Sequence, residues 1–195
     1  METRTLINNY GTCTYKVVVP SMKVILVYSP SGDAYFQDFS TALKHIGGQY
    51  GDLIIDISAT KFAEDCYIHT MEGDPDSTLA SVQIMEICEI WNYTCDKTYK
   101  FIVDSINSYL SIGTDLLVVN MNNDSHPLCT GRVLDFCEKS NITCASVSLQ
   151  SCVDTKVSAL ETSEGNKRVS YYTLIYNRET RDDIISLFYK QYMGV

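Results

Sequence analysis

Basic residues are scarce in this chain and never cluster. The 195 residues include 15 Lys and Arg against 24 Asp and Glu, which gives a net charge of −9. The longest basic element is the pair Lys167 and Arg168. Sequence-independent binding to nucleic acid depends on Lys and Arg side chains that displace counterions from the phosphates. The composition therefore argues against a nucleic-acid-binding function.

Long hydrophobic runs are missing as well. No apolar run approaches the roughly 20 residues that a transmembrane helix needs. The first residues, METRTLINNYGTCTY, lack the apolar stretch of a secretory signal. We therefore expect a cytoplasmic protein without direct membrane insertion.

The sequence also lacks metal-site spacings and the common catalytic motifs. Its eight cysteines never occur as C-x-x-C and its three histidines stand singly, so tetrahedral zinc spacing is absent. Gly-x-Ser-x-Gly, Gly-x-Gly-x-x-Gly and Walker patterns are missing too. Cys129 lies close to His126 in the sequence, which is the pairing that a Cys nucleophile would need. We expect no metal, no cofactor and no catalytic residue, and the balance of motifs favours a non-enzyme.

Short apolar runs alternate with amphipathic stretches from residue 22 onward. The segment MKVILVYS, residues 22–29, holds an unbroken apolar row, which is typical of a strand buried on both faces. Apolar residues at three- and four-residue steps then predict a helix over residues 34–50. The same reasoning predicts further strands over 52–58, 114–120, 142–149 and 169–176. It predicts further helices from a cap at Asp76 or Ser77 to Trp91, over 97–111 with Asp96 as N-cap, over 133–140 and over 181–193.

This alternation predicts an α/β fold with three layers. We expect a mainly parallel, five-stranded, flavodoxin-like sheet with strand order 2-1-3-4-5 and helices on both faces. The length and the 45% hydrophobic content suit one domain over residues 22–195. Residues 1–21 contain one strand-like piece closed by Pro20 and are expected to form an N-terminal arm or an edge strand. Residues 151–167 are expected to be a polar connection.

The loop Ser29–Asp33 lies where open α/β sheets bind ligands, at the carboxyl end of the first buried strand. It partly matches the phosphate loop of flavodoxins, which holds a phosphate by hydroxyls and backbone N–H groups. However, Asp33 adds a negative charge and no basic residue is near. We therefore expect Ser31 or Asp33 to cap the following helix instead.

Three pieces of the sequence resemble the SEFIR domain, the cytoplasmic signalling module of interleukin-17 receptors and their adaptor, which is related to the TIR domain. They are MKVILVYS followed by Asp33 and an amphipathic helix, LIIDIS with the acidic Asp56, and FIVDSINSYLSIGTDLLVVN. The resemblance covers about residues 22–192. It implies a non-enzymatic module that binds other SEFIR-type domains or signalling adaptors and is compatible with homo-oligomers.

Charged residues after the second and third predicted strands are our candidates for the partner-binding surface. Charges on such faces complement those of a partner and set specificity and association rate. The candidates are Lys61, Glu64, Asp65, Arg132, Asp135 and Glu138.

An enzyme is the alternative interpretation. A small flavodoxin-like or TIR-like enzyme would act on a nucleotide, flavin or NAD, in a cleft beside Ser29–Asp33 and residues 122–126. A cleft that is open and polar would favour this alternative, and a cleft filled by side chains would favour the binding module.

Overall fold

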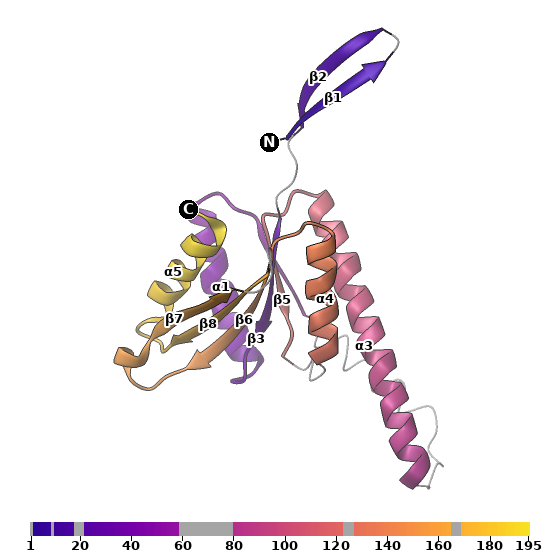
Figure 1. Cartoon of the computed structure of the whole chain (residues 1–195). Helices are drawn as coiled ribbons and strands as arrows, with labels where there is room; N and C mark the ends of the chain where they lie inside the picture. The colour runs from indigo at the N-terminus through magenta and orange to yellow at the C-terminus, as the bar shows by residue number, and fades with distance from the viewer. Residues whose placement is uncertain (1, 9, 18–21, 59–79, 123–126, 165–168) are drawn as a thin grey trace.

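The computed structural model describes residues 2–8, 10–17, 22–58, 80–122, 127–164 and 169–195 (Figure 1). Near the N-terminus, Glu2–Asn8 (β1) and Gly11–Val17 (β2) pair with each other as an antiparallel hairpin. This hairpin is a sheet of its own, and the main sheet begins only at β3.

The main sheet has six strands and is parallel except at one edge. β7 pairs antiparallel with β8, and every other neighbouring pair in the sheet is parallel. The predicted α/β class with a mainly parallel sheet is therefore confirmed. The strands are Lys23–Tyr28 (β3), Ile54–Ser58 (β4), Leu116–Asn120 (β5), Cys144–Ser151 (β6), Ala159–Glu164 (β7) and Val169–Tyr176 (β8).

The predicted strand order is wrong. The sheet runs β4-β5-β3-β6-β8-β7, so β5 lies between β4 and β3, where the order 2-1-3-4-5 placed β3 between β4 and β5. Both β3 and β5 are apolar runs with their central residues fully buried. Because a strand buried on both faces looks the same at either inner position, the hydrophobic pattern does not distinguish the two orders.

The predicted strand count is also wrong, because β7 lies in what we expected to be a polar connection. Residues 161–163 are exposed, whereas Leu160 packs against the core. An edge strand carries polar residues along its free side, so its sequence is similar to that of a loop. A short 3₁₀ turn, Thr155–Val157 (η1), precedes it.

In the described part of the chain, four helices cover the sheet: Asp33–Gln49 (α1), Ala80–Ser111 (α3), Pro127–Lys139 (α4) and Arg181–Met193 (α5). The two helices predicted over 77–91 and 97–111 are one continuous helix, α3, because no Gly or Pro interrupts residues 80–111. Asp96 therefore lies inside a helix and is not an N-cap. α4 begins six residues earlier than expected, at a proline, which the first helical position favours.

The strands of the sheet divide the core into two halves. Ile25 and Val27 of β3 pack with α1 and α5, while Val24 and Leu26 pack with α3 and α4. Successive side chains of a strand point to opposite faces, so one apolar run serves both halves. The helices accordingly lie in two layers, α1 with α5 on one face and α3 with α4 on the other (Figure 1). None of the helices in the described ranges is both long and apolar enough to cross a bilayer.

Candidate functional site

The loop after β3 folds back on itself before α1. The Gly32 N–H donates to the Ser29 carbonyl (3.1 Å), and the Ser29 hydroxyl donates to the Gly32 carbonyl (3.2 Å). Gly32 has a φ of +93°, a conformation that favours glycine, and it directly precedes α1. The predicted side-chain cap from Ser31 or Asp33 is wrong, because α1 begins with no side-chain cap and Asp33 is already its first residue.

Asp33 instead joins α1 to the end of β5. Its Oδ1 accepts hydrogen bonds from Asn120 Nδ2 (3.2 Å) and Asn122 Nδ2 (2.9 Å). Asn120 Oδ1 accepts from the Asn122 N–H (3.1 Å), and Asn122 Oδ1 accepts from the Ser29 N–H (2.6 Å). Asn120 is only 2% exposed. We call Ser29, Asp33, Asn120 and Asn122 the closed edge, because hydrogen bonds among them join the ends of β3 and β5 to the start of α1.

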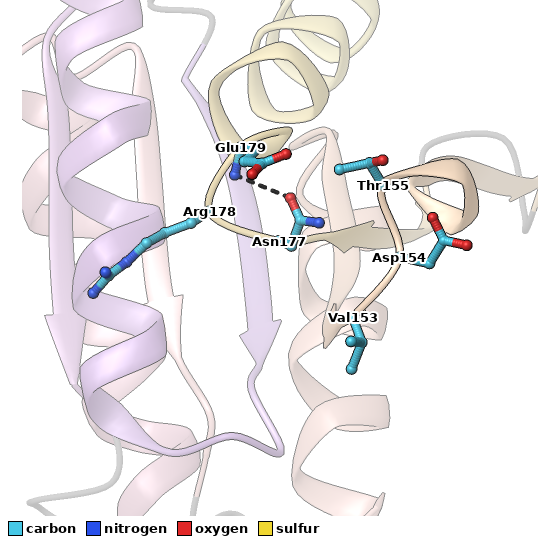
Figure 2. A pocket seen from close by; sticks show the side chains of 6 residues that line it. All are labelled: Val153, Asp154, Thr155, Asn177, Arg178 and Glu179. Carbon is cyan, nitrogen blue, oxygen red and sulfur yellow. Dashed lines mark hydrogen bonds between the residues drawn. The ribbon is translucent and has the colours of Figure 1, made fainter.

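A cleft of about 430 Å³ lies further along the same edge, between the start of α1 and the turn from β8 to α5. A second hollow of about 460 Å³ lies on the other side of that turn (Figure 2). Asn177 and Arg178 line both. The first of these hollows, which we call the Arg178 cleft, is lined by Ser31, Ala34, Tyr35, Asp38, Tyr176, Asn177, Arg178 and Arg181.

Hydrogen bonds of Asn177 and Thr180 shape the turn between β8 and α5. Asn177 Oδ1 accepts from the N–H groups of Glu179 (3.0 Å, dashed in Figure 2) and Thr180 (3.1 Å). Thr180 Oγ1 in return accepts from the Asn177 N–H (3.1 Å). These reciprocal bonds order the turn without using Arg178. The Arg178 side chain extends away from the other labelled residues, toward α1 (Figure 2).

The two arginines of the cleft differ in their partners. Arg181 donates to Asp182 Oδ1 (2.9 Å) and to Asp38 Oδ1 (2.6 Å), and these hydrogen bonds raise the pKa of Arg181. Arg178 is exposed and forms no ion pair with any residue that the structure describes. Arg181 is thus shared by Asp38 and Asp182, and Arg178 is the arginine of the cleft that has no ion pair among the described residues.

Two stacked tyrosines lie beside these arginines. The rings of Tyr35 and Tyr176 are 5.2 Å apart and inclined by 12°. The Tyr35 hydroxyl donates to the carbonyls of Tyr176 (3.2 Å) and Gln150 (3.3 Å). Tyr176 is 1% exposed, and its hydroxyl has no hydrogen-bond partner among the described residues. Burial raises the pKa of Tyr176, and the charges of Tyr35 and Asp38 add to this effect. A buried hydroxyl without a partner costs about 1–3 kcal/mol.

The predicted partner-binding residues of α4 lie on the opposite face of the sheet from α1 and α5. Arg132 and Asp135 are exposed, and Glu138 is half-buried. Arg132 forms an ion pair with Asp96 of α3 and stacks over the Tyr99 ring, 4.2 Å from its centroid. Asp135 pairs with Lys139 one turn along the helix (2.7 Å). The other three predicted residues, Lys61, Glu64 and Asp65, lie outside the described residues.

Sequence reasoning placed Ser29–Asp33 beside residues 122–126 but missed the hydrogen bonds of the closed edge, and it missed the Arg178 cleft. The motif Asn-x-Asn at the end of an apolar strand, residues 120–122, was a signal for the first. The segment Asn-Arg-Glu-Thr-Arg, residues 177–181, between a strand and a helix was a signal for the second. Of the Cys–His pair considered above, Cys129 is fully buried and His126 lies outside the described residues.

Comparisons with known proteins do not place the chain in a family. No protein-family model matches it, and no curated protein matches it either. Within the described ranges, no three His, Cys, Asp or Glu side chains gather in a way that would hold a metal ion.

Proposed function

We propose that this chain is a non-enzymatic, cytoplasmic signalling module of the SEFIR type that binds other SEFIR-type domains or adaptors. The observation that carries the proposal is the closed edge, in which the Asp33 carboxylate accepts from Asn120 and Asn122. A nucleotide phosphate at that loop would meet a carboxylate where a nucleotide-binding fold offers donors. The sequence resemblance, carried by MKVILVYS, LIIDIS and Asp56, supplies the type of module.

The partner surface that we propose consists of charged residues of α4 together with charged residues that follow β4 in the sequence. Arg132, Asp135 and Glu138 offer charges of both signs on one helix. Residues of both signs suit a partner with a complementary pattern, which steers association and rejects partners with like charges. The remaining members of the surface are Lys61, Glu64 and Asp65.

A charge-swap experiment tests this surface. Arg132→Glu combined with Asp135→Lys reverses both charges and leaves the net charge of the chain unchanged. In a pull-down with a receptor-type SEFIR domain, this variant is expected to lose at least about tenfold in affinity, which corresponds to one or two charged contacts. A matched control, Asp183→Lys with Lys190→Glu, swaps two exposed charges on α5 and is expected to bind normally.

Thermal unfolding of both variants separates folding from binding. Arg132→Glu also removes the exposed ion pair with Asp96, which is worth at most about 1 kcal/mol. Equal binding by both variants would remove α4 from the proposed surface. No binding of the wild-type chain to any SEFIR-type domain would remove the proposed function.

Two simple measurements separate the module from a nucleotide enzyme. The purified chain is expected to be colourless, because a bound flavin would make it yellow. Incubation with NAD is expected to leave the NAD intact. A flavin spectrum or cleaved NAD would favour the enzyme.

A further inference from the structure

The Arg178 cleft combines an available cation with room for a small molecule. Arg178 is exposed, extends toward α1 and has no ion pair among the described residues (Figure 2). Asp38, the acidic residue of the lining, forms an ion pair with Arg181 at 2.6 Å. A planar guanidinium with free N–H groups fits a phosphate or carboxylate through two parallel hydrogen bonds. In a chain with net charge −9, Arg178 thus gives the cleft a cation that is available to an anion.

A second observation points to the same ligand. Tyr176 belongs to the same lining and stacks on Tyr35, and its hydroxyl is buried without a partner among the described residues. Buried polar side chains almost always have a hydrogen-bond partner. A phosphate oxygen in the cleft would accept a hydrogen bond from this hydroxyl, which has no acceptor within the described residues.

The volume of the cleft indicates how large a ligand it can hold. About 430 Å³ lies within the range of small-molecule sites and exceeds what an inorganic phosphate fills. Ala34 and the half-buried Tyr35 give the lining an apolar part. A ligand that fills the cleft therefore has an organic group beside its charged group.

We propose that the Arg178 cleft binds a small organic phosphate, with Arg178 holding the phosphate and the Tyr176 hydroxyl donating to it. Ala34 and Tyr35 contact the organic part. This site is separate from the α4 part of the proposed protein-binding surface, because α4 covers the opposite face of the sheet. Either proposal can fail without the other.

Titrations of the full chain with phenyl phosphate, inorganic phosphate and phenol test the ligand class. Calorimetry is expected to show phenyl phosphate binding at least about tenfold more tightly than inorganic phosphate, and no binding of phenol. Binding of phenol equal to that of phenyl phosphate would overturn the proposal, as would the absence of phenyl phosphate binding.

Three substitutions test the role of Arg178. Arg178→Gln is expected to weaken phenyl phosphate binding by about tenfold or more, since it removes the charge. Arg178→Lys is expected to recover part of the affinity, because it restores the charge without the planar fork. The matched control is Lys190→Gln, which removes the same charge near the far end of α5 and is expected to leave binding unchanged. Equal affinities of Arg178→Gln and Lys190→Gln would overturn the proposal.

Tyr176→Phe tests whether the hydroxyl binds the ligand. The measurement is the rise in unfolding temperature that the ligand causes, which a purely structural role of the hydroxyl would not change. Phenyl phosphate is expected to raise the unfolding temperature of the wild type more than that of Tyr176→Phe, because only the wild type gains the hydrogen bond. An equal rise in both proteins would overturn the role of Tyr176.

Discussion

At the β3–β5 part of the carboxyl edge, the side chains of Asp33, Asn120 and Asn122 all have partners. At the β6–β8 part of the same edge, Arg178 and the Tyr176 hydroxyl have none within the described residues, and a cleft of about 430 Å³ lies beside them. Both parts lie at the end of buried parallel strands. Position at the carboxyl edge therefore does not by itself make a binding site, and the pairing of the polar groups distinguishes the two parts.

Strand order explains why the cleft forms where it does. α1 follows β3 and α5 follows β8, and β6 lies between these two strands. Both helices lie on one face of the sheet, whereas the chain leaving β6 enters η1 and β7. The starts of α1 and α5 thus border the end of β6 with no helix between them, and Tyr35 reaches across to the Gln150 carbonyl. The order that we predicted would have put two strands between β3 and β8.

The closed edge is expected to give the largest effect when its pairing is broken. Asn120→Asp replaces a buried amide by a carboxyl group that faces Asp33. Two carboxylates at that distance repel each other, so we expect the variant to lose about 3 kcal/mol of unfolding free energy at neutral pH. Urea unfolding at several pH values measures this loss.

The pH dependence of the same variant sharpens the test. Repulsion and burial raise the pKa of the introduced carboxyl group in the folded state. The loss is then absent below its unfolded pKa, about 3.9, and grows as the pH rises through that value toward the folded pKa. The control Asn120→Ala has no such group, so its loss is expected to stay nearly constant between pH 4 and 7. Identical pH profiles for the two variants would contradict this account of the closed edge.

Removing a polar group from the Arg178 cleft is expected to raise the free energy of unfolding, whereas the change at the closed edge lowers it. Tyr176→Phe removes a hydroxyl that has no partner among the described residues, and it leaves the stacked ring in place. We expect the free energy of unfolding to rise by about 1 kcal/mol in the absence of ligand. The matched control is Tyr192→Phe, since the Tyr192 hydroxyl is buried and donates to the Val24 carbonyl at 2.8 Å. The Tyr192→Phe variant is expected to lose about 1 kcal/mol of unfolding free energy, because it loses a hydrogen bond. A lower unfolding free energy in both variants would contradict the difference between a paired and an unpaired hydroxyl.

Breaking the ion pair of Asp56 with Lys44 is expected to give the smallest change in the free energy of unfolding. Asp56 accepts from Ser40 Oγ (2.8 Å) and Lys44 Nζ (2.6 Å). Burial alone would raise the pKa of Asp56, but the hydrogen bonds from Lys44 and Ser40 outweigh it and lower the pKa. Because the folded pKa is depressed, this contribution to stability is present above the unfolded pKa and is lost as the pH falls through the folded pKa.

Lys44→Met measures that contribution. We expect it to lower the free energy of unfolding by less than about 1 kcal/mol at pH 7, since the Lys44 side chain is 40% exposed. The difference from the wild type is expected to shrink in acid. Lys190→Met, which removes a charge from an exposed residue of α5, is expected to show little change at either pH. A difference for Lys44→Met that stays constant from pH 7 to pH 2 would contradict the ion pair.

Elements with a strong local pattern were predictable. The strand over 169–176 and the helix over 181–193 have the predicted ends, and the apolar stripe Phe36, Phe39 and Leu43 is buried as expected. These patterns depend on neighbours in the chain, since a helix buries residues three and four apart. Asp96 was misjudged because an acidic residue before an apolar stripe is typical of a helix start, yet it also fits the exposed side of a longer helix.

The candidate site was far less predictable. Asp33 looked like a helix cap, because its amide partners Asn120 and Asn122 are almost ninety residues away in the chain. Arg178 looked like one more surface charge. Only the fold shows that Arg181 is occupied by Asp38, while Arg178 forms no ion pair in the described part of the chain.

The order of residues along the chain was thus enough to determine the α/β class, the parallel core and the boundaries of the elements with the clearest pattern, because these follow from apolar periodicity and from Gly and Pro positions. Tertiary structure alone decided the strand order, the sixth strand, the closed edge and the Arg178 cleft. Each of these depends on which distant segments pair. The sequences of two equally apolar strands, such as β3 and β5, do not indicate which strands they pair with. In the same way, a polar residue in the sequence does not indicate which distant residue it bonds.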